Sequence, residues 1–187
     1  LEWVRDQAMM SVAADHAGLP EVAESLLERM FTRSVDDRGG TVESSRLPEP
    51  DTMELDQNGI LLNALWTHWA WTGRRGFVER HWKKARKLAE FVLRPEFRDP
   101  ESGLVANRRE FWERWPGHGV RKGYEIAYQA WNVVGLEKAA EMARALGDPA
   151  ASRRWLSASR RMRDSMLFHP KVSLVEGGRF VKRRLVD

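Results

Sequence analysis

The sequence predicts an all-α domain of three antiparallel helical hairpins, followed by a short C-terminal β-hairpin. Apolar side chains recur at the three- and four-residue spacing of helices along the chain. Gly18, Gly73 and Gly147 each separate the two helical stretches of one pair. With 187 residues, of which 42% are hydrophobic, the chain is long enough for one domain with a real core. We therefore expect a single domain over residues 1–187.

The first predicted pair of helices covers residues 2–16 and 20–33. The second of these helices has a one-sided apolar stripe that includes Leu26, Leu27 and Met30. Pro20 suits the first turn of a helix, where its missing N–H costs nothing. A polar loop follows over residues 35–52. The stripe predicts an outer helix with one buried face.

The next two pairs repeat this pattern, over residues 55–71 with 77–93 and residues 123–146 with 149–168. In each pair the first helix is apolar on most sides and the second carries a basic face. We therefore expect the helices that begin near residues 2, 55 and 123 to lie inside, with the other three outside. If these helices form only half of a ring, Leu62, Trp66 and Trp131 would face water on the uncovered flanks of the inner helices. Residues 172–186, around Gly177-Gly178, predict a β-hairpin.

Inner and outer helices that alternate are typical of an α/α toroid, and a helical solenoid gives nearly the same pattern. The loops distinguish the two architectures. A solenoid keeps its loops short, whereas the loops over residues 35–52 and 94–122 are long and polar. Long loops at one end of a rigid scaffold commonly carry function.

Composition restricts the classes of partner. The net charge is +4, but the basic excess lies near the C-terminus, where an outer helix and a hairpin would be solvated, so we expect no nucleic-acid partner. No apolar run of about 18 residues and no signal peptide is present, so we expect no membrane association. The chain has no Cys, and its five His show no ligand spacing, so we expect neither metal nor cofactor. Its nine Trp suit a helical core and also the flat faces of sugar rings.

Two polar clusters lie where predicted inner helices begin. Trp3-Val4-Arg5-Asp6-Gln7 combines a ring, a cation and a carboxylate, which could stack on a sugar and bind its hydroxyls. A first-turn Asp beside a core Trp would give the same pattern. Glu54-Leu55-Asp56-Gln57-Asn58-Gly59 has more polar groups than a helix cap needs, although an Asp N-cap with solvated neighbours remains an alternative.

The third cluster lies in the loop before the last inner helix, in the run from Glu110 to Gly119. Trp112 and Trp115 flank Glu113 there. Desolvation by two indoles would raise the pKa of that carboxyl toward the range of a general acid. A surface acid in a loop held by buried Trp is equally consistent with the pattern.

These clusters resemble motifs of glycoside hydrolase family 15, the glucoamylase-like enzymes. Trp3-Val4-Arg5-Asp6 resembles the signature near the start of the family's catalytic domain. Asp56-Gln57-Asn58-Gly59 is similar to the segment that opens a later inner helix, and Phe111-Trp112-Glu113 is similar to the tryptophan-glutamate motif. The resemblance spans most of the chain, although each motif is short and related six-hairpin glycosidases share similar pieces. It implies about half of an (α/α)6 toroid and inverting hydrolysis of an α-glucosidic bond in an oligosaccharide or glucan.

The resemblance also implies roles for individual residues. Glu113 would be the general acid that protonates the leaving oxygen, and Arg5 and Asp6 would bind the sugar whose bond is cut. The remaining substrate-binding candidates are Trp3, Asp56, Trp112 and His118. Many family members carry a second glutamate directly after the first, where this chain has Arg114, so leaving-group recognition would differ.

The predicted hairpins amount to half of the family's ring. An inverting glycosidase needs a second carboxylate, roughly 6.5 to 9.5 Å from the acid, to activate water. In the family it comes from the other half of the barrel. We therefore expect the remainder of the barrel, or a second subunit, to complete the site, and these residues alone to be nearly inactive and prone to associate.

Two other functions fit the same helices. A non-catalytic sugar-binding or scaffold protein would keep the Trp residues and lack a working base. A helical-repeat module would bind an acidic partner through the C-terminal Arg cluster. The basic residues concentrated there are Arg153, Arg154, Arg160, Arg161, Arg163, Lys182, Arg183 and Arg184.

Overall fold

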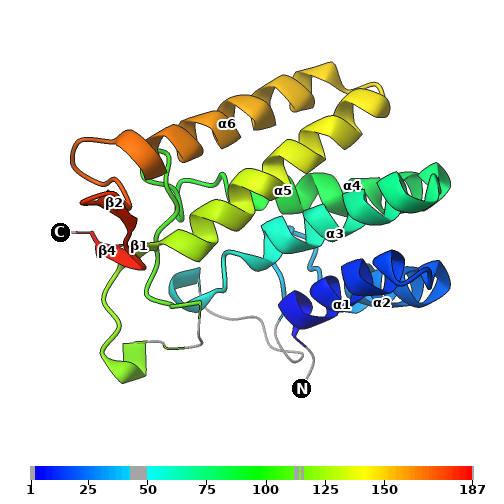
Figure 1. Cartoon of the computed structure of the whole chain (residues 1–187), viewed down its shortest axis with the longest axis horizontal. Coiled ribbons are helices and arrows are strands. Elements are labelled where there is room, and N and C mark those ends of the chain that lie inside the picture. The colour runs from blue at the N-terminus through cyan, green and yellow to red at the C-terminus, as the bar shows by residue number, and fades with distance from the viewer. Residues whose placement is uncertain (1–2, 43–49, 112–113, 115, 187) are drawn as a thin grey trace.

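The computed structural model describes residues 3–42, 50–111, 114 and 116–186 of the chain. This part forms three helical hairpins with short strands near the C-terminus, as Figure 1 shows. None of its helices combines the length and the apolar character needed to cross a membrane. The helices are α1 (Val4–His16), α2 (Pro20–Arg33), α3 (Gln57–Thr72), α4 (Arg75–Phe91), α5 (Ile126–Ala145) and α6 (Pro149–Phe168).

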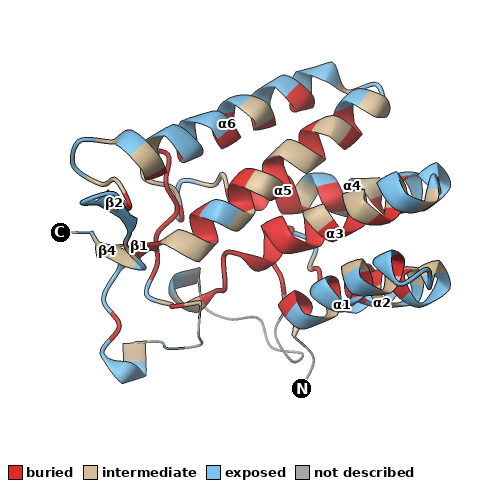
Figure 2. Ribbon diagram, in the orientation of Figure 1, coloured by how far each residue is buried: buried red, intermediate tan, exposed pale blue. Residues whose placement is uncertain are grey.

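The helices form an inner row of α1, α3 and α5 and an outer row of α2, α4 and α6. Helix α3 packs against both α1 and α5, and each inner helix packs against the outer helix that follows it. Figure 2 shows α3 and α5 buried along much of their length, while α6 exposes its outward side. The predicted all-α hairpins, with an inner helix over residues 57–72 that is more buried than the outer one over 75–91, are therefore confirmed.

The predicted hairpin breaks coincide with glycines in a left-handed backbone conformation. Gly18 has a φ of 76°, Gly73 of 70° and Gly147 of 82°. At the end of α3 the N–H of Gly73 donates to the main-chain oxygen of Trp69 at 2.8 Å. Residues that carry a Cβ rarely adopt this backbone conformation. Each glycine therefore allows the chain to end one helix and reverse direction into the next.

Helices α3 and α5 approach each other closely at two glycines. A Cβ on Gly59 would lie 2.1 Å from the main-chain oxygen of Trp131, and one on Gly135 would lie 2.4 Å from the Cα of Gly59. Beside this crossing, Asn132 donates its side-chain amide to the main-chain oxygen of Leu55 at 2.7 Å. The crossing therefore fixes the beginning of α3 against α5.

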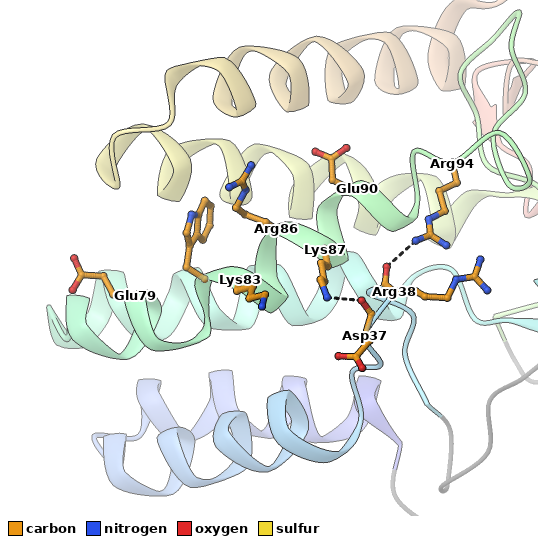
Figure 3. A pocket seen from close by; sticks show the side chains of 9 residues that line it. Asp37, Arg38, Glu79, Lys83, Arg86, Lys87, Glu90 and Arg94 are labelled. Carbon is orange, nitrogen blue, oxygen red and sulfur yellow. Dashed lines mark hydrogen bonds between the residues drawn. The ribbon is translucent and has the colours of Figure 1, made fainter.

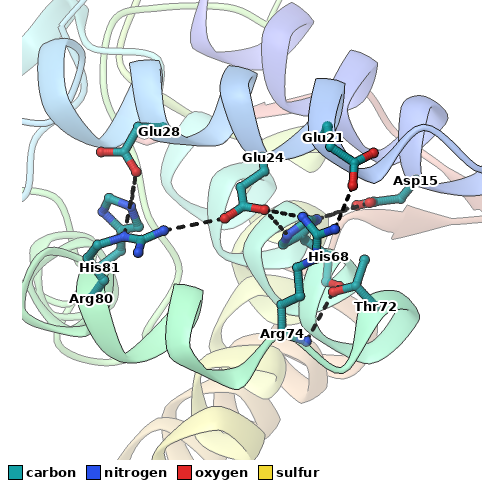
Figure 4. A network of polar contacts seen from close by, with 9 residues as sticks. All are labelled: Asp15, Glu21, Glu24, Glu28, His68, Thr72, Arg74, Arg80 and His81. Carbon is teal, nitrogen blue, oxygen red and sulfur yellow. Dashed lines mark hydrogen bonds and ion pairs between the residues drawn. The ribbon is translucent and has the colours of Figure 1, made fainter.

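A network of polar contacts joins the first hairpin to the second near the C-terminal ends of α1 and α3 (Figure 4). Nδ1 of His68 lies 3.0 Å from Oδ1 of Asp15, and both side chains are fully buried. Arg74 forms ion pairs with Glu21, at 2.6 Å, and with Glu24. These contacts fix α2 and α4 relative to the inner helices at the end opposite the three polar clusters.

The strands differ in part from the prediction. Strands β2 (Val175–Glu176) and β3 (Arg179–Phe180) form the expected hairpin. Strand β4 (Arg183–Leu185) pairs antiparallel with β1 (Gly123–Glu125), which the sequence assigned to the first turn of a helix. The N–H of Ile126 donates to the main-chain oxygen of Lys182 at 2.9 Å. Because the backbone groups of this segment are satisfied by the distant strand, α5 begins only at Ile126.

The apolar side chains that face water are also not all those predicted. Leu62 is buried, with 1% of its surface exposed, because α3 is covered on both sides. Trp66 and Trp131 are half-buried. Helix α1 instead exposes Met9 and Met10, at 52% and 59%.

Candidate functional site

Arg5, near the beginning of α1, forms buried ion pairs with the segment that leads into α3. Its Nε donates to Oδ2 of Asp56 at 2.8 Å, and one terminal nitrogen donates to Oε2 of Glu54 at 2.7 Å. The Arg5 side chain is 9% exposed and both carboxylates are fully buried. The first two polar clusters of the sequence therefore meet in space.

The loop before α5 joins the same contacts. Arg109 donates to Oε1 of Glu54 at 3.1 Å, and the guanidinium carbon of Arg5 lies 4.2 Å from the centroid of the Phe111 ring. We call Arg5, Glu54, Asp56, Arg109 and Phe111 the Arg5 cluster. It unites residues from the beginnings of two inner helices with residues of the loop before the third.

Further hydrogen bonds complete the surroundings of the two carboxylates. Gln57, the first residue of α3, donates its amide to Oε2 of Glu54 at 2.6 Å. Asp56 precedes α3, but its side chain makes no capping hydrogen bond and is directed to Arg5. The alternative of a capping Asp with solvated neighbours is therefore wrong for this segment.

Electrostatics in the Arg5 cluster follow from burial and pairing. Burial raises the pKa of Asp56 above its ordinary value, and the hydrogen bond and charge of Arg5 oppose that shift. Burial by itself would lower the pKa of Arg5, but its contacts with Asp56 and Glu54 outweigh that effect and raise it. Two guanidinium groups face two carboxylates, so the formal charges balance, as buried charges require. The cluster is suited to hold three segments in place, rather than to transfer a proton.

Tyr128 of α5 lies in the field of the same carboxylates. Its side chain is fully buried, and its hydroxyl has no hydrogen-bond partner among the described residues. Burial, followed by the negative charges of Asp56 and Glu54, raises the pKa of the phenol. The hydroxyl therefore remains a neutral donor at physiological pH.

The C-terminal strand fixes the loop before α5 through Arg183. Its guanidinium donates to the main-chain oxygens of Asn107 at 2.7 Å, Arg109 at 2.8 Å and Arg121 at 2.7 Å. It also lies 3.3 Å from Oε2 of Glu125, and the Arg183 side chain is only 9% exposed. We call these contacts the Arg183 clamp, because they hold both ends of the loop over residues 107–121.

A second contact, from Lys182 directly before β4, reaches the loop near its beginning. Nζ of Lys182 donates to Oε2 of Glu110 at 2.7 Å. This hydrogen bond lowers the pKa of Glu110, against a smaller opposing effect of burial. Burial raises the pKa of Glu125, and the charges of Lys182 and Arg183 oppose that rise.

No protein-family model matches the chain. The chain is similar to a glycosyl hydrolase. A protein of Methanocaldococcus jannaschii, described as an uncharacterized glycosyl hydrolase, is 29% identical over 94 residues, which make up 48% of this chain and 15% of the relative. The likeness supports a relationship with glycosyl hydrolases, and it does not distinguish family 15 from others.

The structure brings together only some of the predicted site residues. Arg5 and Asp56 meet in the Arg5 cluster, and Trp3 is half-buried directly before α1. Asp6 is exposed in the first turn of α1, and His118 is exposed in the short 3-10 helix Pro116–His118. The remaining two candidates, Trp112 and Glu113, lie outside the described residues.

Three members of the Arg5 cluster, Glu54, Arg109 and Phe111, were not among the predicted site residues. Glu54 stood in a motif that the sequence singled out, but nothing there distinguished it from a solvated neighbour. Phe111 stood in the third motif but was assigned no role, and Arg109 belongs to the same loop, in which the Trp residues dominated the pattern. Among the described residues, no group of three or more His, Asp or Glu is arranged to hold a metal ion.

Proposed function

We propose that this chain forms part of a glycoside hydrolase that hydrolyses an α-glucosidic bond in an oligosaccharide or glucan with inversion. The observation that carries the proposal is the Arg5 cluster, in which the first two family-like motifs meet Phe111, the first residue of the third. The similarity to a glycosyl hydrolase over 94 residues adds support. The matched segment spans 15% of that relative, so the activity of a whole enzyme is part of the proposal.

In this proposal Glu113 is the general acid. It follows Phe111 by two residues, and the ring of Phe111 lies against Arg5. Glu113 gives its proton to the glycosidic oxygen as the bond to the anomeric carbon breaks. Water attacks that carbon from the opposite face, and a carboxylate base takes the proton of the water. The base comes from the remainder of the barrel or from a second subunit.

The other candidates bind or position the substrate. Trp3 and Trp112 offer flat apolar rings to the sugar, and His118 borders the leaving group. Asp6, exposed beside Arg5, accepts hydrogen bonds from sugar hydroxyls. Arg5 donates its hydrogen bonds to Asp56 and Glu54. Arg5 and Asp56 therefore position the sugar-binding residues rather than bind the sugar themselves.

The test uses the full-length protein and maltooligosaccharides. Glu113→Gln keeps the shape of the side chain but removes the acid, so kcat should fall about 10²- to 10⁴-fold while sugar binding is retained. Glu101→Gln, at an acid that is 70% exposed twelve positions earlier in the connection between α4 and β1, is the matched control and should leave kcat unchanged. Proton NMR should show the β-anomer as the first product. An unchanged kcat in Glu113→Gln would remove Glu113 from the mechanism, and an α-anomer would exclude inversion.

A further inference from the structure

A groove follows the solvent-exposed face of α4, and it shares no residue with the Arg5 cluster (Figure 3). Its volume of about 700 Å³ falls in the range of ligand sites. The α4 residues that line it, from Glu79 to Glu90, recur every three or four positions and so occupy one side of the helix. The eleven steps from Glu79 to Glu90, at a rise of about 1.5 Å each, give this side a length of about 16 Å, enough for a short oligosaccharide.

Cationic side chains dominate the groove, and two of them have no acidic partner. Among the described residues, no carboxylate or other acceptor lies within bonding distance of Lys83, which is exposed. Lys87 donates to the main-chain oxygen of Asp37 at 2.6 Å, a contact that leaves its charge without a counter-charge. Arg94 donates to the main-chain oxygen of Arg38 at 3.0 Å, and it also forms an ion pair with Glu96 at 3.7 Å. Figure 3 shows the contacts of Lys87 with Asp37 and of Arg94 with Arg38. They lie at the end of the groove where the loop after α2 lines it.

An indole ring lies beside these cations. Trp82 lines the groove and is half-buried, and its ring meets that of Trp155 edge-on at 6.0 Å. Trp155 is itself held, because its Nε1 donates to Glu90 at 2.7 Å. Trp82 is therefore supported from behind, and a supported indole offers the flat apolar surface on which a sugar ring packs.

The carboxylates of the groove indicate which kind of anion fits. Glu79 and Glu90 lie on the same face of α4 as the lysines, and Asp37 lines the groove from the loop after α2. Glu79 also pairs with Arg75, and Glu90 pairs with Arg154. Carboxylates accept hydrogen bonds from sugar hydroxyls, but they repel the closely spaced phosphates of a nucleic acid, whose binding depends on uninterrupted cations. The combination of cationic side chains and carboxylates in the groove favours a ligand with many hydroxyls and a few negatively charged groups.

We propose that this groove binds an anionic oligosaccharide, with Trp82 packed against one sugar ring and Lys83 and Lys87 bound to its carboxylate groups. The site goes beyond the proposed hydrolase activity and does not depend on it. It lies on the outer row of helices, whereas the candidate catalytic residues belong to the inner row and its loops.

The test is calorimetric titration of the full-length protein with tetragalacturonate at low salt. Lys83→Gln/Lys87→Gln should weaken binding about tenfold, since each exposed ion pair contributes about three- to fivefold. Trp82→Leu should weaken it about two- to tenfold through the lost ring contact. The matched control is Arg153→Gln/Arg160→Gln, which removes the same charge from exposed positions of α6 outside the groove and should leave the affinity unchanged. Circular dichroism checks that each variant is folded.

Two further ligands separate the alternatives. Maltotetraose has no charge, and a thymidine pentanucleotide has the same charge as tetragalacturonate in the form of phosphates. Weaker binding of both supports the proposal. Equal binding of maltotetraose, equal or tighter binding of the pentanucleotide, undetectable binding of tetragalacturonate at millimolar concentration, or an unchanged affinity in the double lysine variant would each overturn it.

Discussion

Replacing Arg5 by Met should destabilise the protein far more than the loss of an ordinary surface ion pair. The variant leaves Asp56, which is fully buried, without the guanidinium that donates to it at 2.8 Å. Glu54 keeps Arg109 and Gln57 as partners, so the cost falls mainly on Asp56. Removing one partner of a buried ion pair costs about 3 to 5 kcal/mol, and we expect about 3 kcal/mol here because Glu54 remains paired. Since about 5 to 15 kcal/mol separates folded from unfolded protein, that is a large share.

Urea unfolding followed by tryptophan fluorescence measures the loss, and the melting temperature should fall by about 6 to 12 °C, at about 2 to 4 °C per kcal/mol. Arg75→Met is the control, because Arg75 and Glu79 form a half-exposed pair whose loss costs at most about 1 kcal/mol. If Arg5→Met costs no more than this control, the buried contacts of Arg5 do not stabilise the fold.

The same variant has a characteristic dependence on pH. Burial already raises the pKa of Asp56 above its ordinary value of 3.8, and Arg5 opposes that rise. Without Arg5 the pKa in the folded state rises further, so the folded protein takes up a proton that the unfolded chain does not hold. The destabilisation should therefore be largest at neutral pH and shrink as the pH falls toward the ordinary value. A loss that is independent of pH would show that Asp56 does not carry the cost.

Two more predictions follow from other contacts. Gly59→Ala places a Cβ 2.1 Å from the main-chain oxygen of Trp131 and should cost about 1 to 3 kcal/mol of unfolding free energy. The control Gly76→Ala places a Cβ with nothing within 4 Å and should raise the unfolding free energy by about 0.4 to 1 kcal/mol. Equal effects of the two variants in urea unfolding would contradict the close helix crossing. Lys182→Met should cost about 1 kcal/mol or less at pH 7 and progressively less in acid, because Lys182 lowers the pKa of Glu110 and that stabilisation is lost as the pH falls through the lowered pKa. A cost that does not shrink as the pH falls would contradict this prediction.

Helices were predictable from the sequence because their signals are local. Apolar spacing located all three hairpins, and Gly18, Gly73 and Gly147 marked their turns, each with a positive φ. The end of α6 at Phe168 was also correct. Strand β1 was missed because its partner lies 58 to 62 positions later in the chain, and a three-residue strand has no periodicity that distinguishes it from a helical turn.

Individual contacts of the site could not be predicted in the same way. The sequence indicated that Arg5 and Asp56 belong to one site, and the structure joins them directly. The sequence could not indicate that both side chains would be buried, because a charged residue at the beginning of a helix is usually stable when exposed to solvent. Only the tertiary arrangement, which brings Glu54 and Arg109 to the same place, makes burial of these charges possible.

The Arg183 clamp has a consequence for synthesis on the ribosome. Arg183 follows Arg121, at the far end of the loop it holds, by 62 positions. At about 5 to 20 residues per second, translation reaches Arg183 about 3 to 12 s after the loop is made. Throughout that interval, while α5 and α6 emerge and pair, the loop before α5 lacks its only described anchor on β4. The hairpins can thus assemble before the Arg183 clamp forms, and the later synthesis of β4 gives the loop its final position.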